Sequence, residues 1–509
     1  MIPRQYQRRA ATTAICCLLL LLANVIYLFS RHGMAEGMRT VGWMRGMMRR
    51  PMPSLVNDTS MQADVVAAMK WAWNGYRDHA MGHDSLDVIN MNGTAFSDHD
   101  LAISLADSLD TLFLLGLHDD FDDAATWAEA NLPHKFDGPG KVSLFETTIR
   151  VLGGLLAAHQ LSGRPGLLDL ADDLGGRLLP GMRSSLLPRS FVSLEDATAN
   201  GPSFLAEFTS IQLEFKYLAV LTDDSDYSEA VEDIMDTVSQ SVLREYVDGL
   251  VPIYVDNELG RIHRSRIKLG AGGDSYYEYL LKQWVFSGKR QDRYRDMYET
   301  AVTGIMDKLV GRTKKSGWVF LGELEVNGDL TPKMDHLVCF MPGMLALGYM
   351  HGMPSSHLDL AKALGRTCFE MYNQMASNLA PEIAYFNTVD DSNDIQVHAS
   401  DAFNILRPET VESLMVLYRV TRDDTYREWG KVIFRAFEQH CRLPQGGYSS
   451  VNHVDSPAPS KFFRREMESF FMAETLKYFY LLFSDESVVP LDQFVFNTEA
   501  HPFPIQWRT

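Results

Sequence analysis

Pairs of acidic residues recur along the chain at spacings that place both side chains on one face of a helix. The pairs are Asp107 with Asp110, Glu207 with Glu214, Asp274 with Glu278, and Glu409 with Glu412. A solvated acidic face would explain one such helix, but the flanking residues are apolar and the pattern repeats, which favours a central acidic cavity. Carboxyl groups and aromatic rings around a cavity suit hydrolysis of a glycosidic bond, because one carboxyl group protonates the leaving oxygen and another activates or replaces water.

Other charged residues lie in segments that are otherwise apolar. Glu146 and Arg150 stand one helical turn apart, either as a structural salt bridge or as an arginine that fixes a catalytic carboxyl group. Glu468 and Glu474 lie in a similar apolar run, where a carboxylate needs a partner cation, a hydrated cavity or a metal. Carboxylate and carbonyl oxygens suit calcium better than zinc, so calcium is the metal that these residues favour.

Seven segments could position these residues, each with a polar or acidic head followed by an apolar run of helical period. They begin at Leu105, Phe145, Phe204, Gly273, Asp335, Arg407 and Met467, and after the first interval the starts are about 60 residues apart. More amphipathic segments lie between them, so each unit is interpreted as one buried helix and one outer helix. Short strand-like runs predict hairpins in the connections. The sequence therefore predicts an all-α fold in which seven helix pairs close into a toroid.

Composition narrows the class of ligand. The chain has 509 residues, of which 46% are hydrophobic and 22% charged, so it has enough apolar material for a large folded domain. Its formal net charge of -19 would repel a phosphate backbone, which argues against a nucleic-acid partner. The segment from Asp390 lacks the glycine that an EF-hand needs, and the motifs H-E-x-x-H and G-x-S-x-G are absent. Cations and neutral polyols are the ligands that fit.

The N-terminal region differs from the rest of the chain. Residues 1–10 are basic and predict a cytoplasmic tail, whereas residues 11–29 form an apolar run near the ~20 residues that span a bilayer. A cleaved signal peptide is the rival interpretation, but no clear A-x-A cleavage site is present. Residues 30–62 predict a stem, and residues 63–505 predict one lumenal domain behind this anchor.

Two further features fit a domain on the lumenal side. Asn57 and Asn92 each begin an N-glycosylation triplet. Three cysteines, Cys339, Cys368 and Cys441, follow the predicted anchor, so one disulfide can form and one thiol remains. The residues alone do not choose the pair, and they define no oligomeric state.

Seven motifs in the predicted domain resemble the class I α-1,2-mannosidases of glycoside hydrolase family 47. They are FETTIRVLGGLL, LEFKYL, GDSYYEYLLKQW, KMDHLVCFMPGMLALG, LRPETVES, MESFFMAETLKYFYLLFSD and VFNTEAHP. The resemblance implies an (αα)7 barrel that removes terminal α-1,2-linked mannose from high-mannose N-glycans by a calcium-dependent, inverting reaction. It also implies a disulfide between Cys339 and Cys368. Anchor, stem and catalytic domain match the family's secretory-pathway layout, with a single-pass type II Golgi enzyme expected here and the endoplasmic reticulum as the alternative.

The resemblance implies roles for individual residues. Glu146 matches the general acid, Glu409 matches the general base that activates water, and Asp274 matches a third essential carboxylate that could share the acid role. Thr498 matches the calcium ligand, through its hydroxyl and carbonyl oxygens. The residues that match the surroundings of sugar and calcium-bound water are Arg150, Glu207, His336, Glu412, Phe470, Glu474 and Glu499.

Two expectations about mechanism and specificity follow from the resemblance. Inversion requires about 6.5–9.5 Å between the carboxyl groups of Glu146 and Glu409, which leaves room for water. Two residues before Asp274, endoplasmic-reticulum-type members carry Arg and animal Golgi-type members carry Leu, but this chain has Gly272. A long cation that would hold one glycan branch is missing there, so the sequence predicts a roomier cleft that trims several mannoses.

Two alternative functions are compatible with a helical toroid. One is a non-catalytic, glycan-binding relative in glycoprotein quality control, which the presence of all three candidate carboxylates and Thr498 disfavours. The other is a scaffold for protein partners, which would show an apolar surface patch and would leave the acidic cavity unexplained. Release of mannose that a chelator abolishes would separate the enzyme from both alternatives.

Overall fold

The computed structural model describes residues 57–506, which contain the predicted catalytic domain. The predicted cytoplasmic tail, the predicted anchor and the stem up to residue 56 lie outside these residues. Between residues 57 and 506, no helix is both long enough and apolar enough to cross a membrane. Asn57 and Asn92, the two predicted glycosylation sites, have exposed side chains.

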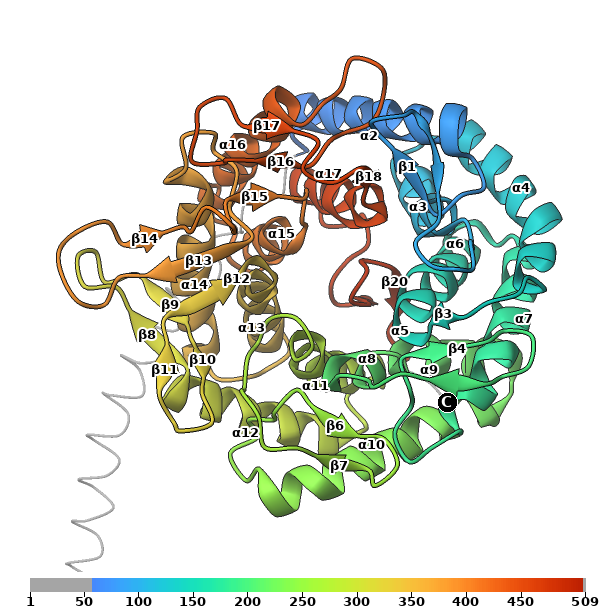
Figure 1. The fold of residues 1–509 in the computed structure, drawn as a ribbon, viewed down its shortest axis with the longest axis horizontal. Coiled ribbons are helices and arrows are strands. Elements are labelled where there is room, and N and C mark those ends of the chain that lie inside the picture. The colour runs from blue at the N-terminus through green and yellow to red at the C-terminus, as the bar shows by residue number, and fades with distance from the viewer. Residues whose placement is uncertain (1–56, 507–509) are drawn as a thin grey trace, which may run out of the picture. The chain divides into compact units, whose positions relative to one another are not determined.

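The described chain is mostly helical and forms two concentric rings of seven helices each (Figure 1). The inner ring is α3 (Ile103–Leu114), α6 (Gly153–Ser162), α9 (Gln212–Thr222), α11 (Asp274–Phe286), α13 (Met341–Met350), α15 (Glu409–Thr421) and α17 (Leu476–Phe483). The outer ring is α2 (Thr59–Ala80), α4 (His118–Phe136), α7 (Pro165–Met182), α10 (Ser225–Glu245), α12 (Asp292–Lys308), α14 (Ser355–Asn373) and α16 (Thr425–His440). The predicted helical toroid is confirmed for residues 57–506, although α2 begins at Thr59, inside the segment predicted as stem.

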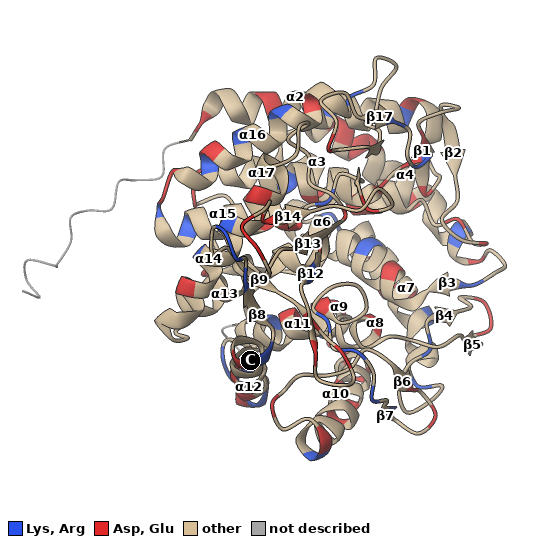
Figure 2. Cartoon of the chain, turned by 60° about the vertical axis from the view of Figure 1, so that its left-hand side comes forward, with Lys and Arg blue, Asp and Glu red and all other residues tan. Residues whose placement is uncertain are grey.

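The pattern of buried residues explains why each helix lies in the inner or in the outer ring. Inner helices such as α11 and α13 are apolar on nearly every side and are buried along almost their whole length. Outer helices such as α16 bury one stripe, which includes Ile433, Phe434 and Phe437, and expose polar residues on the other face. Charged residues of both signs lie along α16, α7 and α12 in Figure 2.

The rings close because elements far apart in sequence pack together. The inner helices from α3 to α17 contact one another in chain order, the segment Phe471–Thr475 that precedes α17 packs against α3, and α2 packs against α17. Strand β1 (Ser85–Asp87) pairs antiparallel with β18 (Glu466–Met467), with Leu86 opposite Met467. The first and last helical units are therefore joined by both helix packing and backbone pairing.

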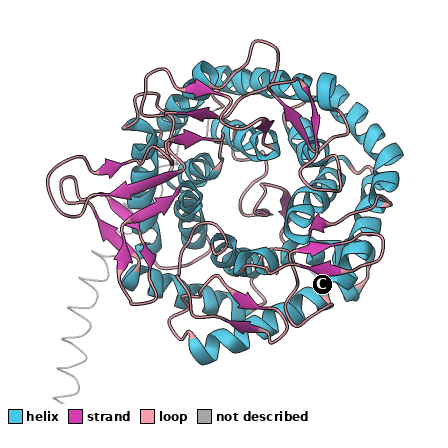
Figure 3. Cartoon of the chain, viewed as in Figure 1, coloured by secondary structure: helices cyan, strands magenta, loops and turns pink. Residues whose placement is uncertain are grey.

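Short antiparallel strands occupy the connections between helices (Figure 3). The other strands are β2 (Asn92–Thr94), β3 (Val142–Ser143), β4 (Phe191–Val192), β5 (Ala199–Asn200), β6 (Val255–Asp256), β7 (Arg261–Ile262), β8 (Val310–Arg312), β9 (Val319–Leu321), β10 (Glu323–Leu324), β11 (Leu330–Thr331), β12 (Lys333–Asp335), β13 (Ile383–Phe386), β14 (Ile395–Gln396), β15 (Phe403–Asn404), β16 (Val451–Asn452), β17 (Ser460–Lys461), β19 (Phe494–Phe496) and β20 (Pro502–Pro504). They form three-stranded sheets β18-β1-β2, β3-β4-β5, β12-β13-β14 and β15-β16-β17, and pairs β6-β7, β8-β9, β10-β11 and β19-β20.

Several inner segments are not the continuous α-helices that their periodicity predicts. The irregular segments are α5 (Leu144–Glu146) with the π-helix η1 (Thr147–Leu152), the separate short helix α8 (Leu205–Thr209), the 3-10 helix η2 (His336–Phe340) and the π-helix η3 (Phe471–Thr475). Sequence periodicity cannot distinguish these forms over five or six residues. Each irregular segment carries predicted site residues, as π-turns and 3-10 turns often do.

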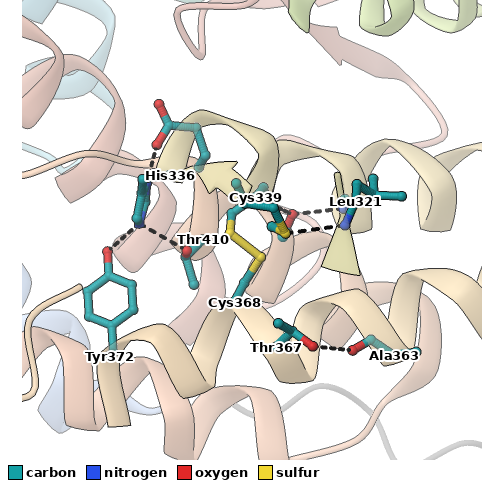
Figure 4. Close-up of a disulfide and its surroundings, with 12 residues drawn as sticks. Leu321, His336, Cys339, Ala363, Thr367, Cys368, Tyr372 and Thr410 are labelled. Carbon is teal, nitrogen blue, oxygen red and sulfur yellow. Dashed lines mark hydrogen bonds and ion pairs between the residues drawn. A yellow bond between two sulfur atoms is a disulfide. The ribbon is translucent and has the colours of Figure 1, made fainter. Parts of the chain in front are cut away.

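The structure pairs Cys339 in η2 with Cys368 in α14 (Figure 4). Cys441 is buried and has no disulfide partner among residues 57–506. The bond fastens the 3-10 segment that begins with His336 to an outer helix, so it stabilises one wall of the ring.

Candidate active site

A cavity of about 530 Å³ opens where the inner helices begin. Asp274 is the first residue of α11 and Glu409 is the first residue of α15, and both line the cavity. Glu146 ends α5 at the start of another inner segment. The positive end of a helix dipole favours negative charge, so these positions help to hold carboxylates close together.

Glu409 is held as a carboxylate. Its Oε2 lies 2.7 Å from Nδ1 of His336, and its Oε1 lies 3.7 Å from the Arg407 guanidinium. Burial alone would raise the pKa of Glu409, but the hydrogen bond from His336 and the charge of Arg407 outweigh it, and the pKa is lowered. The second ring nitrogen of His336 lies 2.8 Å from the Tyr372 hydroxyl and 3.2 Å from that of Thr410 (Figure 4). The imidazole is therefore fixed with one nitrogen facing the carboxylate.

Asp274 has the opposite electrostatic setting. Desolvation, with the charges of Glu278 and Glu409, raises its pKa to about 7. The hydrogen bond from the Ser275 backbone N–H, 2.9 Å from Oδ1, and the charge of Lys268 oppose the rise without cancelling it. Near neutral pH Asp274 is therefore partly protonated, whereas the lowered pKa of Glu409 favours its carboxylate form. Two carboxyl groups with pKa values driven apart are suited to acid and base roles.

The Glu146–Arg150 pair belongs to a larger network inside the cavity. Arg150 donates from Nε to Glu146 at 2.7 Å, and from its terminal nitrogen to Glu499 at 2.7 Å and to the Ser469 hydroxyl at 2.8 Å. The same guanidinium lies 3.7 Å from Asp107. The pair is therefore more than an isolated structural salt bridge, because Arg150 orients two cavity carboxylates at once.

The floor of the cavity holds more carboxylates than cations. Desolvation, opposed by Lys282, raises the pKa of Glu412 to about 8. Desolvation, with the charge of neighbouring carboxylates, raises the pKa values of Glu474 and Glu499 well above the ordinary range. Lys282 pairs with Glu278 and lies 3.8 Å from Glu412. Such a floor either retains protons or attracts a further cation.

Thr498 lies at the tip of the hairpin β19–β20, which rises into the centre of the ring (Figure 1). The tip is tightly fixed, because Oδ1 of Asn497 accepts the backbone N–H groups of Glu499 at 2.9 Å and His501 at 2.8 Å. Gly153 permits the close approach of α6, since a Cβ there would lie 2.8 Å from both Asn497 and His501. Thr498 is thereby fixed in place where it lines the cavity.

The structure brings nearly all the predicted site residues together. The cavity is lined by Glu146, Arg150, Glu207, Asp274, Glu409, Glu412, Phe470, Glu474, Thr498 and Glu499. His336 lies behind Glu409 rather than on the cavity wall. Sequence reasoning missed Arg407 and Lys268, both of which line the cavity. The position of Arg407 two residues before Glu409 in the LRPET motif could have indicated its role, whereas no sequence pattern indicates Lys268.

Calcium can be tested against these oxygens. Among residues 57–506, no group of three or more His, Cys, Asp and Glu side chains is arranged to hold a metal ion. Thr498, by contrast, offers two uncharged oxygens above a floor with excess carboxylate. A hard cation that keeps several waters fits this set, with Thr498 as direct ligand and the carboxylates bound to its waters.

A double ring of helices around a cavity lined by carboxyl groups is suited to the hydrolysis of a glycosidic bond. The chain matches the model for Glycosyl hydrolase family 47 over residues 68–505 and belongs to that family. It is a glycoside hydrolase.

Relatives and a solved structure agree with this membership. The endoplasmic reticulum mannosyl-oligosaccharide 1,2-alpha-mannosidase of Rattus norvegicus is 46% identical over 458 residues, which cover 87% of this chain and 68% of the rat protein. The mannosyl-oligosaccharide 1,2-alpha-mannosidase MNS3 of Arabidopsis thaliana is 43% identical over 502 residues, 88% of this chain and 80% of that protein. The alpha-1,2-mannosidase from Trichoderma reesei superposes with a TM-score of 0.80 at 28% identity, covering 88% of this chain and 100% of that one.

Proposed function

We propose that the protein is a calcium-dependent, inverting exo-α-1,2-mannosidase that trims terminal mannose from high-mannose N-glycans. The observation that carries the proposal is that Glu409 and Asp274 line one cavity while their surroundings drive the pKa values of the two carboxyl groups apart. The names of the rat and Arabidopsis relatives support the mannosyl-oligosaccharide substrate.

The residues divide the reaction between them. Glu409 accepts a proton from the attacking water, and His336 positions its carboxylate. The leaving oxygen takes a proton from Asp274 or from Glu146, which Arg150 orients. Phe470 supplies an apolar wall for the sugar ring, with the Arg150 and Arg407 guanidinium groups 5.7 and 5.8 Å from its ring centroid.

Calcium, when bound, would polarise and orient sugar hydroxyls and water. Thr498 would hold it directly, and Glu412, Glu474 and Glu499 would accept hydrogen bonds from its waters. Their raised pKa values support this arrangement, because an added cation would let the same carboxyl groups ionise.

Gly272 supports the prediction that the enzyme removes several mannoses from one glycan. It lines the cavity, has a φ of +86°, and a Cβ there would lie 3.3 Å from the Cβ of Phe204. An L residue would be strained in this conformation, so the space beside Asp274 is kept open. We therefore propose that several mannoses are removed, and arrest after one specific mannose of a nine-mannose glycan would contradict this.

Two observations bear on the cellular compartment of the protein, namely the names of its relatives and its N-terminal segment. The rat relative is named for the endoplasmic reticulum, which supports the secretory pathway and favours that compartment over the Golgi membrane expected from the family's layout. The single-pass type II anchor at residues 11–29 stays part of the proposal. Imaging of a tagged full-length chain beside markers of both compartments would decide between them.

One experiment tests the activity directly. The purified protein is incubated with a nine-mannose N-glycan, with and without a calcium chelator, and the products are followed by mass and by the anomer released. We expect loss of hexose units as the inverted β-anomer of mannose, arrested by the chelator. Binding of the glycan without release of mannose would instead favour the non-catalytic alternative, and release of α-mannose would contradict inversion.

A further inference from the structure

Three phenylalanines, two of them exposed, lie on chain segments that lead to the wall of the catalytic cavity. Phe403 lies in β15, and Phe462 and Phe463 follow β17 directly. The rings of Phe403 and Phe463 are stacked, with centroids 4.2 Å apart and planes 20° apart. The Phe462 and Phe463 residues are 41% and 39% exposed, so neither lies in the buried core. We call Phe403, Phe462 and Phe463 the rim platform.

The backbone under the rim platform is built to hold these rings outward. The Phe462 N–H donates to the Ser449 hydroxyl at 2.8 Å, and the Arg464 N–H donates to the Ser450 hydroxyl at 2.6 Å. Both serines are buried. Phe462 has a φ of +63°, a conformation that is strained for a bulky side chain. A strained, well-anchored loop that exposes aromatic rings points to binding.

Both segments of the rim platform continue into the cavity wall. Four residues after Phe403 the chain reaches Arg407, a distance of at most about 13 Å along extended backbone. On the other segment, Arg464 pairs with Glu468 at 2.7 Å, and Phe470 follows in the cavity. Arg407 lies over the Phe470 ring, so the two segments meet at the sugar-facing wall. Both segments of the rim platform are therefore connected, within a few residues along the chain, to side chains of the cavity wall.

We propose that the rim platform binds a mannose residue on an oligosaccharide arm that is not being cleaved. This inference rests on the proposed function, because a cavity that holds a terminal mannose leaves the rest of a branched glycan outside. Hexopyranoses present apolar C–H faces that pack on flat aromatic rings, while their hydroxyls remain free for polar groups. The half-exposed guanidinium groups of Arg464 and Arg465 follow the platform and suit those hydroxyls. Continuity with the cavity favours the glycan over a polypeptide segment.

The test compares a branched substrate with one too short to reach the rim platform. The variants are Phe463→Ala, Phe462→Ala with Phe463→Ala, and Phe463→Trp, which keeps a ring. Leu243→Ala, on the outer helix α10, is the matched control because it also removes an exposed apolar side chain. Rates are measured with a nine-mannose N-glycan and with α-1,2-linked mannobiose, and the readout is the ratio of the two kcat/KM values.

We expect the alanine variants to lower this ratio about 3- to 10-fold, chiefly through KM for the glycan, as for the loss of one aromatic contact. Phe463→Trp and Leu243→Ala should keep the wild-type ratio. An unchanged ratio in active alanine variants overturns the inference and leaves the proposed function intact. A loss seen only with an intact glycoprotein, and not with free glycan, assigns the rim platform to polypeptide instead. A wild-type protein that releases mannose from neither substrate overturns both proposals.

Discussion

Lys477 provides a quantitative test of how the catalytic floor is held. Its ammonium group lies 2.6 Å from Asp110 Oδ2 and 2.8 Å from the Ala500 carbonyl, and both charged side chains are wholly buried. Ala500 has a φ of +60°, so the hairpin tip that carries Thr498 is strained and depends on this hydrogen bond. Removing one partner of a buried ion pair costs about 3–5 kcal/mol. His501 Nδ1 also lies 3.3 Å from Asp110 Oδ2, so the lower end of this range is expected here.

We expect Lys477→Met to lower the free energy of unfolding by about that amount, measured by guanidinium denaturation at constant slope m. Lys70→Met, at an exposed position of α2, is the matched control and should change it by at most about 0.5 kcal/mol. Adding Asp110→Asn to Lys477→Met should recover at least about 1 kcal/mol, since the buried carboxylate that has lost Lys477 is then replaced by a neutral group. If Lys477→Met destabilises no more than Lys70→Met, the tip is not held by this ion pair.

Four further outcomes are expected from the cavity. Glu409→Gln should lower kcat about 10²- to 10⁴-fold with little change in KM or in the circular dichroism spectrum, and near-normal turnover would exclude Glu409 as the base. Since the pKa of Asp274 is raised to about 7 and the acid must be protonated, kcat/KM should fall as the pH rises through about 7; a rate that stays level to pH 9 would remove Asp274 from the acid role. His336→Ala takes away the hydrogen bond that helps lower the pKa of Glu409, so the acidic limb of the same profile should move to higher pH by about one unit, and an unmoved limb would mean that His336 does not position the base. Removal of calcium should lower the melting temperature by several degrees, calcium but not magnesium should restore it, and equal restoration by both ions would contradict a calcium site.

The ring could be predicted because its signals are repeated and long. The segments beginning at Leu105, Gly273 and Arg407 each show helical period over more than ten residues, and burial on all sides follows from their composition. The predicted acidic cavity is confirmed by Asp274 with Glu278 and by Glu409 with Glu412, whereas Asp107 and Asp110 are buried against His501 and Lys477 and do not line it. How individual inner segments begin could not be predicted. Over the six residues Thr147–Leu152, the same sequence pattern is compatible with a π-helix and with an α-helix.

Which cavity carboxyl group has a raised pKa and which has a lowered one could not be predicted from the sequence either. Asp274 and Glu409 are both acidic residues at the start of an inner helix, yet the pKa of one is raised and that of the other is lowered. The difference comes from His336 and Arg407, which face Glu409, and from Glu278, which faces Asp274. These neighbours depend on packing between separate units, which a linear pattern does not contain.

The pairing of β1 with β18 and of α2 with α17 has a consequence for synthesis of the protein. These partners are separated by roughly 400 residues, so at about 5–20 residues per second the earlier element waits about 20–80 s for the later one. The nascent ring stays open during this time and exposes the apolar faces of its inner helices. The hairpin that carries Thr498 emerges later still. Catalytic competence is therefore acquired only after every helix of the ring has been translated, and incomplete chains are candidates for chaperones rather than early catalysts.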